Sequence, residues 1–98
     1  MMASCSEDKT VRLWQPTNGR LVRFARFSTA ITALIWSING EVLYAGATDG
    51  KVYCLDPESL AVRRVVKACE GRIYGLAVSS DGKWIIACGE GGTVVVVR

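Results

Sequence analysis

Short apolar runs separated by glycine-containing turns dominate the hydrophobic pattern of this chain. Residues 31–37 and 73–79 are rich in apolar and β-branched residues, and each run is followed by a turn, Asn-Gly at 39–40 and Asp-Gly at 81–82. These dipeptides favour the positive φ angles that two-residue hairpins require. No helical periodicity is sustained along the chain, so the pattern predicts an all-β fold.

Further strands follow these turns at a regular spacing. In chain order, the pattern predicts them at 41–47, 51–55, 60–68, 83–89 and 93–97. Turns rich in Gly, Asp, Pro and Ser separate these strands at 48–50, 56–59 and 90–92. Such turn residues between apolar runs are typical of antiparallel sheets.

The chain also repeats itself. A shift of 42 places residues 31–55 on residues 73–97 without a gap, and a shift of 41 relates the first segment to the second, with Asp8 on Asp49. A period of this length indicates a repeat protein in which each unit is one small sheet. Such sheets bury their apolar faces by stacking on their neighbours.

One segment resembles a known family. Residues 3–14 are similar to the second and third strands of a WD40 repeat, with a small-residue strand, Asp8 in the turn and an apolar strand that ends at Trp14. The period of 41–42 residues is also that of the family. The resemblance implies β-propeller blades, which are four-stranded antiparallel sheets. It assigns the structural motif positions to Asp8, Trp14 and Asp49, with the two aspartates capping turn amides.

The chain departs from the family pattern at several motif positions. Gln15 replaces the aspartate of the Trp-Asp pair, and Gly91 replaces the turn aspartate in the third copy. The sequence contains no histidine, so the family's histidine–aspartate–tryptophan network cannot form.

The blade pattern divides the single domain 1–98 into three parts. With strands named a to d from the inside of a blade outward, we expect b-c-d in 1–30, a full blade in 31–72 and a-b-c in 73–98. These ten strands do not complete three blades, whereas closed propellers have roughly four to eight. The chain is therefore either a fragment of a longer propeller or a protomer of a homo-oligomeric ring.

The composition and charge of the chain bear on its partners and its cellular location. The chain has 98 residues, 50% of them hydrophobic, and its net charge of +3 comes from scattered basic residues, so nucleic acid is an improbable partner. The longest apolar run, 84–88, is far shorter than a membrane span. No secretion signal is visible, and we expect a cytoplasmic protein with reduced cysteines.

Candidate chemistry is sparse. The four cysteines form no C-x-x-C pair and histidine is absent, so we expect no metal, no cofactor and no serine–histidine triad. The chain is predicted not to be an enzyme. Cys5, Gly46 and Cys88 occupy one repeat position, which indicates a small-residue packing site rather than a reactive thiol.

The family resemblance implies a scaffold that binds protein partners. In such propellers the b–c and d–a turns lie at one face, and mixed charge there suits protein recognition. The candidate residues of this face are Glu7, Asp8, Lys9, Asp49, Lys51, Glu70, Arg72 and Glu90. Two alternatives stay open: a carbohydrate or small-ligand binder with pockets between blades at Trp36, Tyr44 or Tyr74, and a fragment without independent function.

Overall fold

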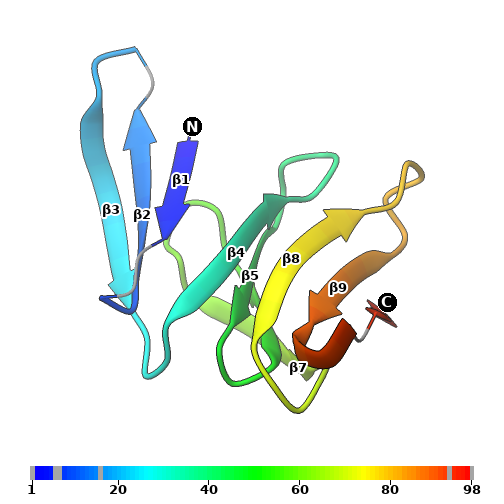
Figure 1. The fold of residues 1–98 in the computed structure, drawn as a ribbon. Coiled ribbons are helices and arrows are strands. Elements are labelled where there is room, and N and C mark those ends of the chain that lie inside the picture. Colours follow the sequence, from blue (N-terminus) through cyan, green and yellow to red (C-terminus); the bar gives the residue numbers. More distant parts are fainter. Residues whose placement is uncertain (1, 6–7, 16, 93, 98) are drawn as a thin grey trace.

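Three antiparallel sheets lie side by side in the computed structural model, which describes residues 2–5, 8–15, 17–92 and 94–97 (Figure 1). The first sheet has the order β1-β2-β3, the second β4-β5-β6-β7 and the third β10-β9-β8. The strands of the first sheet are β1 (Met2–Cys5), β2 (Thr10–Gln15) and β3 (Arg20–Arg26). Those of the second are β4 (Ile31–Trp36), β5 (Leu43–Ala47), β6 (Lys51–Leu55) and β7 (Val62–Lys67). Those of the third are β8 (Ile73–Val78), β9 (Ile85–Gly89) and β10 (Val94–Val97).

The all-β fold of antiparallel blade-like sheets is therefore confirmed. Within the described ranges, the single helical element is the three-residue 3₁₀ turn η1 (Glu90–Gly92). The three sheets fall within 1–30, 31–72 and 73–98, and the division of the chain into blades at those boundaries stays a prediction.

Irregularities of the strands repeat with the sequence. The pairing of β4 with β5 shifts register between Ile31 and Ala33, and that of β8 with β9 shifts between Ile73 and Gly75, 42 residues later. The first and second sheets share a different bulge at equivalent places, after Leu13 in β2 and after Cys54 in β6. Because bulges set how strongly a strand twists, equivalent bulges give the sheets the same curvature and let them stack.

The predicted two-residue hairpins are wrong in length. The loop after β4 closes between Ser37 and Val42, where the Ser37 amide donates to the Val42 carbonyl at 2.9 Å and the Val42 amide donates to Ser37 Oγ at 3.0 Å. Asn39 Oδ1 accepts from Ser37 Oγ and from the Glu41 amide, so side chains fix the longer loop. Within the loop, Gly40 alone has a positive φ, 73°, whereas a type I′ turn needs two such residues.

The third sheet repeats this loop with aspartate in place of asparagine. Asp81 Oδ1 accepts from Ser79 Oγ at 2.6 Å and from the Lys83 amide at 3.0 Å. The hydrogen bonds from the Ser79 hydroxyl and the Lys83 amide lower the pKa of Asp81. As a result β5 and β9 begin two residues later than the sequence pattern predicts, at Leu43 and Ile85.

Two apolar clusters fill the spaces between the sheets. The first lies between the first and second sheets, and its buried members are Val11, Leu13, Ile31, Leu43, Ala45, Ala47, Leu55 and Leu60. The second lies between the second and third sheets and is smaller, with Val52, Ile73 and Ala87 buried. Side chains alternate along a strand, so β5 and β6 contribute odd-numbered residues to the first cluster and even-numbered residues to the second interface. The second sheet is thus covered on both faces.

The second and third sheets approach most closely at Gly46. A Cβ atom there would lie 2.7 Å from Cγ2 of Ile73, which leaves no space for a larger residue. Thr32 Oγ1 donates to the carbonyl of Ile73 and joins the two sheets by a hydrogen bond. At the equivalent positions Cys5 is half-buried against the first cluster, whereas Cys88 is exposed.

Candidate partner-binding face

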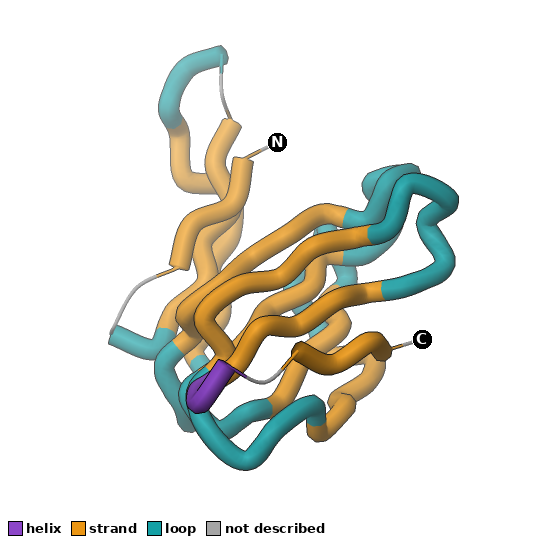
Figure 2. The backbone as a smooth tube through the Cα atoms, turned by 45° about the vertical axis from the view of Figure 1, so that its right-hand side comes forward, coloured by secondary structure: helices purple, strands orange, loops and turns teal. Residues whose placement is uncertain are grey.

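Two kinds of turn lie at the same end of the sheets, the lower end in Figure 1. One kind joins the second and third strands of a repeat, and the other joins one sheet to the next. The described residues of this end, which we call the turn face, are 8–9, 27–30, 48–50, 68–72 and 90–92. Figure 2 shows from a second direction that loops gather at the two ends of the strands.

Backbone hydrogen bonds hold the two kinds of turn together. The Phe27 amide donates to the Lys9 carbonyl at 2.7 Å, and the Ala68 amide donates to Gly50 at 2.9 Å, one repeat later. A second bond of this kind also repeats. The Thr48 amide donates to the Ala30 carbonyl at 3.0 Å, and 42 residues later the Glu90 amide donates to the Arg72 carbonyl. Since these turn amides are bonded to backbone, the face is a fixed surface rather than a set of loose loops.

Asp8 organises the first turn. Its Oδ1 accepts from the Thr10 amide at 3.1 Å and from the Thr10 hydroxyl at 2.5 Å, and its Oδ2 accepts from Arg12 at 3.1 Å. The Thr10 hydroxyl is the main cause that lowers the pKa of Asp8 to about 2, with Arg12 adding to the effect. Asp8 therefore carries a negative charge at the turn face across the physiological pH range.

Asp49 has the same place in the second turn. It accepts from the Lys51 amide at 3.0 Å and from the Tyr53 hydroxyl at 2.8 Å. Burial, followed by the hydrogen bond to Asp49, raises the pKa of Tyr53 to about 12. The ring of Tyr53 meets that of Phe27 edge to face at 5.5 Å, so this turn is tied to the connection from the first sheet.

The third turn uses another residue. Gly91 stands where Asp49 stands in the second copy, and the preceding Glu90 reaches back so that its Oε2 accepts from the Arg72 amide at 3.2 Å. The Glu90 amide donates to the Arg72 carbonyl at 2.8 Å. A Cβ at Gly71 would lie 2.9 Å from Cβ of Glu90, so glycine makes room for this contact.

The structure places Glu70 and Arg72 on one turn, Lys9 on another and Lys51 at the start of β6. Lys9, Glu70 and Arg72 are exposed, Lys51 is half-buried, and Glu7 lies outside the described residues. Arg72 and Glu90 are brought into hydrogen-bond contact, and Lys67, which sequence analysis did not include, donates from Nζ to the Asp49 carbonyl at 3.1 Å. The turn face therefore presents both signs of charge at fixed positions.

The three tryptophans have different surroundings. Trp14 Nε1 donates to Ser4 Oγ at 2.9 Å, on the outer side of the first sheet. Trp36 packs against the first cluster, in keeping with a packing role. Trp84 is 38% exposed at the end of the molecule opposite to the turn face.

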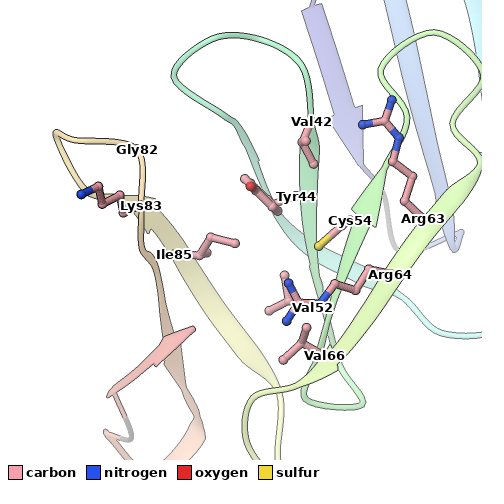
Figure 3. Close-up of a pocket in the computed structure, with 10 residues that line it drawn as sticks. All are labelled: Val42, Tyr44, Val52, Cys54, Arg63, Arg64, Val66, Gly82, Lys83 and Ile85. Carbon is pink, nitrogen blue, oxygen red and sulfur yellow. The ribbon is translucent and has the colours of Figure 1, made fainter. Parts of the chain in front are cut away.

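A cavity of about 240 Å³ opens between the second and third sheets (Figure 3). Tyr44, Val52, Cys54 and Val66 line it from the second sheet, and Ile85 lines it from the third. Tyr44 is the one residue of the three suggested for a ligand pocket that lies here, since Trp36 faces the first cluster and Tyr74 is 59% exposed elsewhere.

Burial raises the pKa of the Cys54 thiol and that of the Tyr44 hydroxyl. Arg64 extends from β7 across this cavity toward Val52. Sequence analysis missed both Cys54 and Arg64. The shift of 41 places Cys54 on Leu13. The smaller side chain of Cys54 at this apolar repeat position was the one sign in the sequence of a cavity there.

Metal and membrane features were also sought. Across the described ranges, no group of three or more acidic or cysteine side chains is arranged to hold a metal ion. No helix in those ranges has the length and apolar character to cross a membrane.

Comparison with known proteins gives concordant matches. The family described as WD domain, G-beta repeat, matches residues 1–15, 20–56 and 61–97. The chain is 33% identical to Protein ROOT INITIATION DEFECTIVE 3 of Arabidopsis thaliana over 98% of its own length and 23% of the relative. It is 31% identical to Nuclear pore complex protein 14 of Caenorhabditis elegans over 91% of its length and 7% of the relative. It is 26% identical to WD repeat-containing protein 18 of Homo sapiens, covering 95% of the chain and 24% of the relative. The chain thus spans a quarter or less of these relatives.

Proposed function

Since the chain belongs to the WD40 repeat family, we propose that it is a non-enzymatic scaffold that binds a protein partner through the turn face. The family as a whole supports a protein-interaction scaffold in general terms. The observation that carries the proposal here is that hydrogen bonds hold the charged groups of Asp8, Asp49, Glu90 and Lys67 at one end of the sheets, with the exposed Lys9 and Arg72 on the same turns. A partner meets these charges already positioned, so little ordering is needed on binding.

The charge pattern supports a protein ligand. Asp8 and Lys9 place one charge of each sign on a turn of the first sheet, and Arg72 and Glu90 do the same on the turns next to the third sheet, at the same end of the molecule. A face of mixed sign is matched by a partner of complementary pattern, which gives specificity and register. A nucleic acid would instead call for a basic stripe.

The experiment that tests the proposal compares two charge-reversal pairs of equal size. Lys9→Glu with Arg72→Glu alters the turn face, and Arg20→Glu with Arg23→Glu alters exposed residues of β3 outside the turn face. A protein captured by the unaltered chain is purified and its affinity measured for both variants. We expect at least about a tenfold loss for the turn-face pair and little change for the control. Equal affinities for the two pairs would refute the turn-face assignment.

We also propose that the stack of sheets is closed into a ring, either by further copies of this chain or by further repeats of one longer chain. We propose a cytoplasmic location for the protein. The outer side of the first sheet exposes Met2 and Phe24, whereas Leu43, equivalent to Met2, is fully buried under the first sheet. The greater length of the relatives supports closure by further repeats of one chain. Light scattering after size exclusion distinguishes the two forms. A ring of copies would have a mass that is a discrete multiple of 10.6 kDa, whereas the mass of a monomer would refute closure by copies of this chain.

A further inference from the structure

The loops that follow β4 and β8 meet at the end of the sheets opposite to the turn face (Figures 1 and 2). Both loops, at 37–42 and 79–84, are closed by the same hydrogen bonds. In the second loop the Ser79 amide donates to the Trp84 carbonyl at 2.9 Å, and the Trp84 amide donates to Ser79 Oγ at 3.0 Å. Because each loop bonds its own backbone, the pair forms a fixed surface.

A pocket of about 330 Å³ lies between the two loops. Ile38, Val42 and Tyr44 form its apolar part. A Cβ at Gly82 would lie 3.8 Å from Cβ of Ile38, so the second loop approaches the first closely there. All of the lining residues lie in the two loops or at the start of β5, and both walls of the pocket therefore belong to this chain.

Ile38 is the most exposed large hydrophobic residue in the described part of the chain, at 62%. The equivalent residue of the loop after β8 is Ser80, so the loop does not need an apolar residue at this position in order to close. Single exposed apolar side chains are common on protein surfaces, but Ile38 stands at a pocket with two further apolar side chains. It is therefore suited to contact an apolar side chain of a partner.

The charge around the pocket is negative, although the net charge of the chain is +3. Glu41 and Asp81 line the pocket, and Glu41 also lines a neighbouring hollow with Asp56. Hydrogen bonds, above all from the Ser79 hydroxyl, lower the pKa of Asp81, so its carboxylate is charged at neutral pH. Asp56 is paired with Arg63 at 2.7 Å, whereas Glu41 and Asp81 form no salt bridge within the described ranges. An incoming cation therefore meets two carboxylates at the pocket.

We propose that this pocket binds an extended segment of a partner protein in which one aliphatic side chain is flanked by lysine or arginine. The aliphatic side chain contacts Ile38, Val42 and Tyr44, and the flanking cations approach Glu41 and Asp81. Burial of the apolar side chain supplies affinity, and the charges select basic over acidic segments. The pocket and the turn face lie at opposite ends of the sheets, so this contact goes beyond the proposed function and leaves the turn face free.

Two short peptides of equal length test the pocket by NMR on the full 98-residue chain. The probe is acetyl-Lys-Leu-Lys-amide and the control is acetyl-Glu-Leu-Glu-amide. With the lysine peptide we expect saturable shifts of the amide signals at 38–42 and 81–83, with a dissociation constant on the order of 1 mM, and about tenfold weaker binding of the glutamate peptide. Equal binding of the two peptides, shifts confined to other parts of the chain, or no binding overturns the proposal. Shifts of the same amides on dilution of the chain alone would assign the pocket to a second copy and would also overturn it.

Ile38→Ser tests the apolar contact without a change in charge. Serine is the residue that the loop after β8 has at the equivalent position, so the loop is expected to stay closed. Val65→Ser is the matched control, because Val65 is 46% exposed on β7 and lies outside the pocket. We expect roughly 3- to 10-fold weaker binding of the lysine peptide to Ile38→Ser and less than about twofold change for Val65→Ser. An unchanged affinity of Ile38→Ser refutes the proposed contact.

Glu41→Gln combined with Asp81→Asn tests the charges. Asn39 occupies the position of Asp81 in the first loop and accepts the same kind of hydrogen bonds, so this double variant keeps the loop. We expect it to bind the two peptides within about twofold of each other, whereas Glu70→Gln, on the turn face, keeps the preference for the lysine peptide. A preference that survives in the double variant overturns the proposal. The turn-face charge-reversal pair should leave peptide binding unchanged, so failure of this inference and failure of the turn-face assignment are separate results.

Discussion

Replacing Gly46 with alanine puts the closeness of the second and third sheets to a quantitative test. The added Cβ would lie 2.7 Å from Cγ2 and 3.3 Å from Cβ of Ile73. Carbon atoms pack best at about 3.5–4.0 Å, so the methyl group is about 1 Å too close. Ile73 is fully buried and has no free direction in which to retreat. Overpacking of this kind costs about 1–3 kcal/mol.

The assay is urea unfolding followed by circular dichroism, with Gly75→Ala as the control. Gly75 lies in β8 and a Cβ there meets no atom within 4 Å. Alanine also restricts the unfolded chain more than glycine, so the control is expected to be neutral or stabilising by up to about 1 kcal/mol. Gly46→Ala is expected to lower the free energy of unfolding by about 1–3 kcal/mol despite the same restriction.

A double-mutant cycle identifies the cause. Ile73→Ala removes the Cγ2 atom that the new methyl group would meet, so Gly46→Ala should cost less in that background than in the unaltered chain. If Gly46→Ala leaves stability unchanged, or costs the same in both backgrounds, the close approach of the sheets at this position is wrong.

Three other predictions concern single groups. Lys9 has a φ of 70° at the position equivalent to Gly50, a backbone conformation that favours glycine. Lys9→Gly is therefore expected to raise the free energy of unfolding by about 0.5–1 kcal/mol. A lower free energy of unfolding, measured in urea, would contradict backbone strain at Lys9. The Ser59 and Glu58 amides and Arg63 hold the pKa of Asp56 at about 2, below its unfolded value, so its contribution to stability is present above about pH 4 and is lost as pH falls toward 2. Asp56→Asn should therefore reduce the fall in melting temperature between those pH values, and an unchanged fall would contradict this. Cys88 should be alkylated much faster than Cys54, which is 8% exposed and has a raised pKa; equal rates by mass spectrometry would contradict the burial.

The sequence was sufficient to predict the sheets but not their loops. Strand positions follow from alternation and from the shifts of 41 and 42, because both are properties of neighbouring residues and of copies of the same unit. The loop after β4 differed from prediction because the side chains of Ser37 and Asn39 bond the backbone and lengthen the turn. A dipeptide rule for Asn-Gly takes no account of such a flanking serine.

The site was predictable in part for a similar reason. The turn residues Asp8 and Asp49 are marked by their local pattern, and the structure shows their hydrogen bonds to the following amides. The cavity beside Cys54 depends instead on which side chains reach across from another sheet, and this is not encoded near Cys54 in the sequence. Comparing Leu13 with its equivalent along the repeat was the route by which it could have been found.

The second sheet, covered on both faces, has a consequence for how the molecule opens. In a stack where each sheet contacts only its neighbours, the outer sheets can separate one at a time while the middle sheet needs both interfaces to break. Amide hydrogens of β5 and β6 should therefore exchange with solvent most slowly, and those of β1 and β10 most quickly. A bound protein that covers an outer sheet would slow exchange in that sheet, so exchange rates would report which end of the stack it occupies.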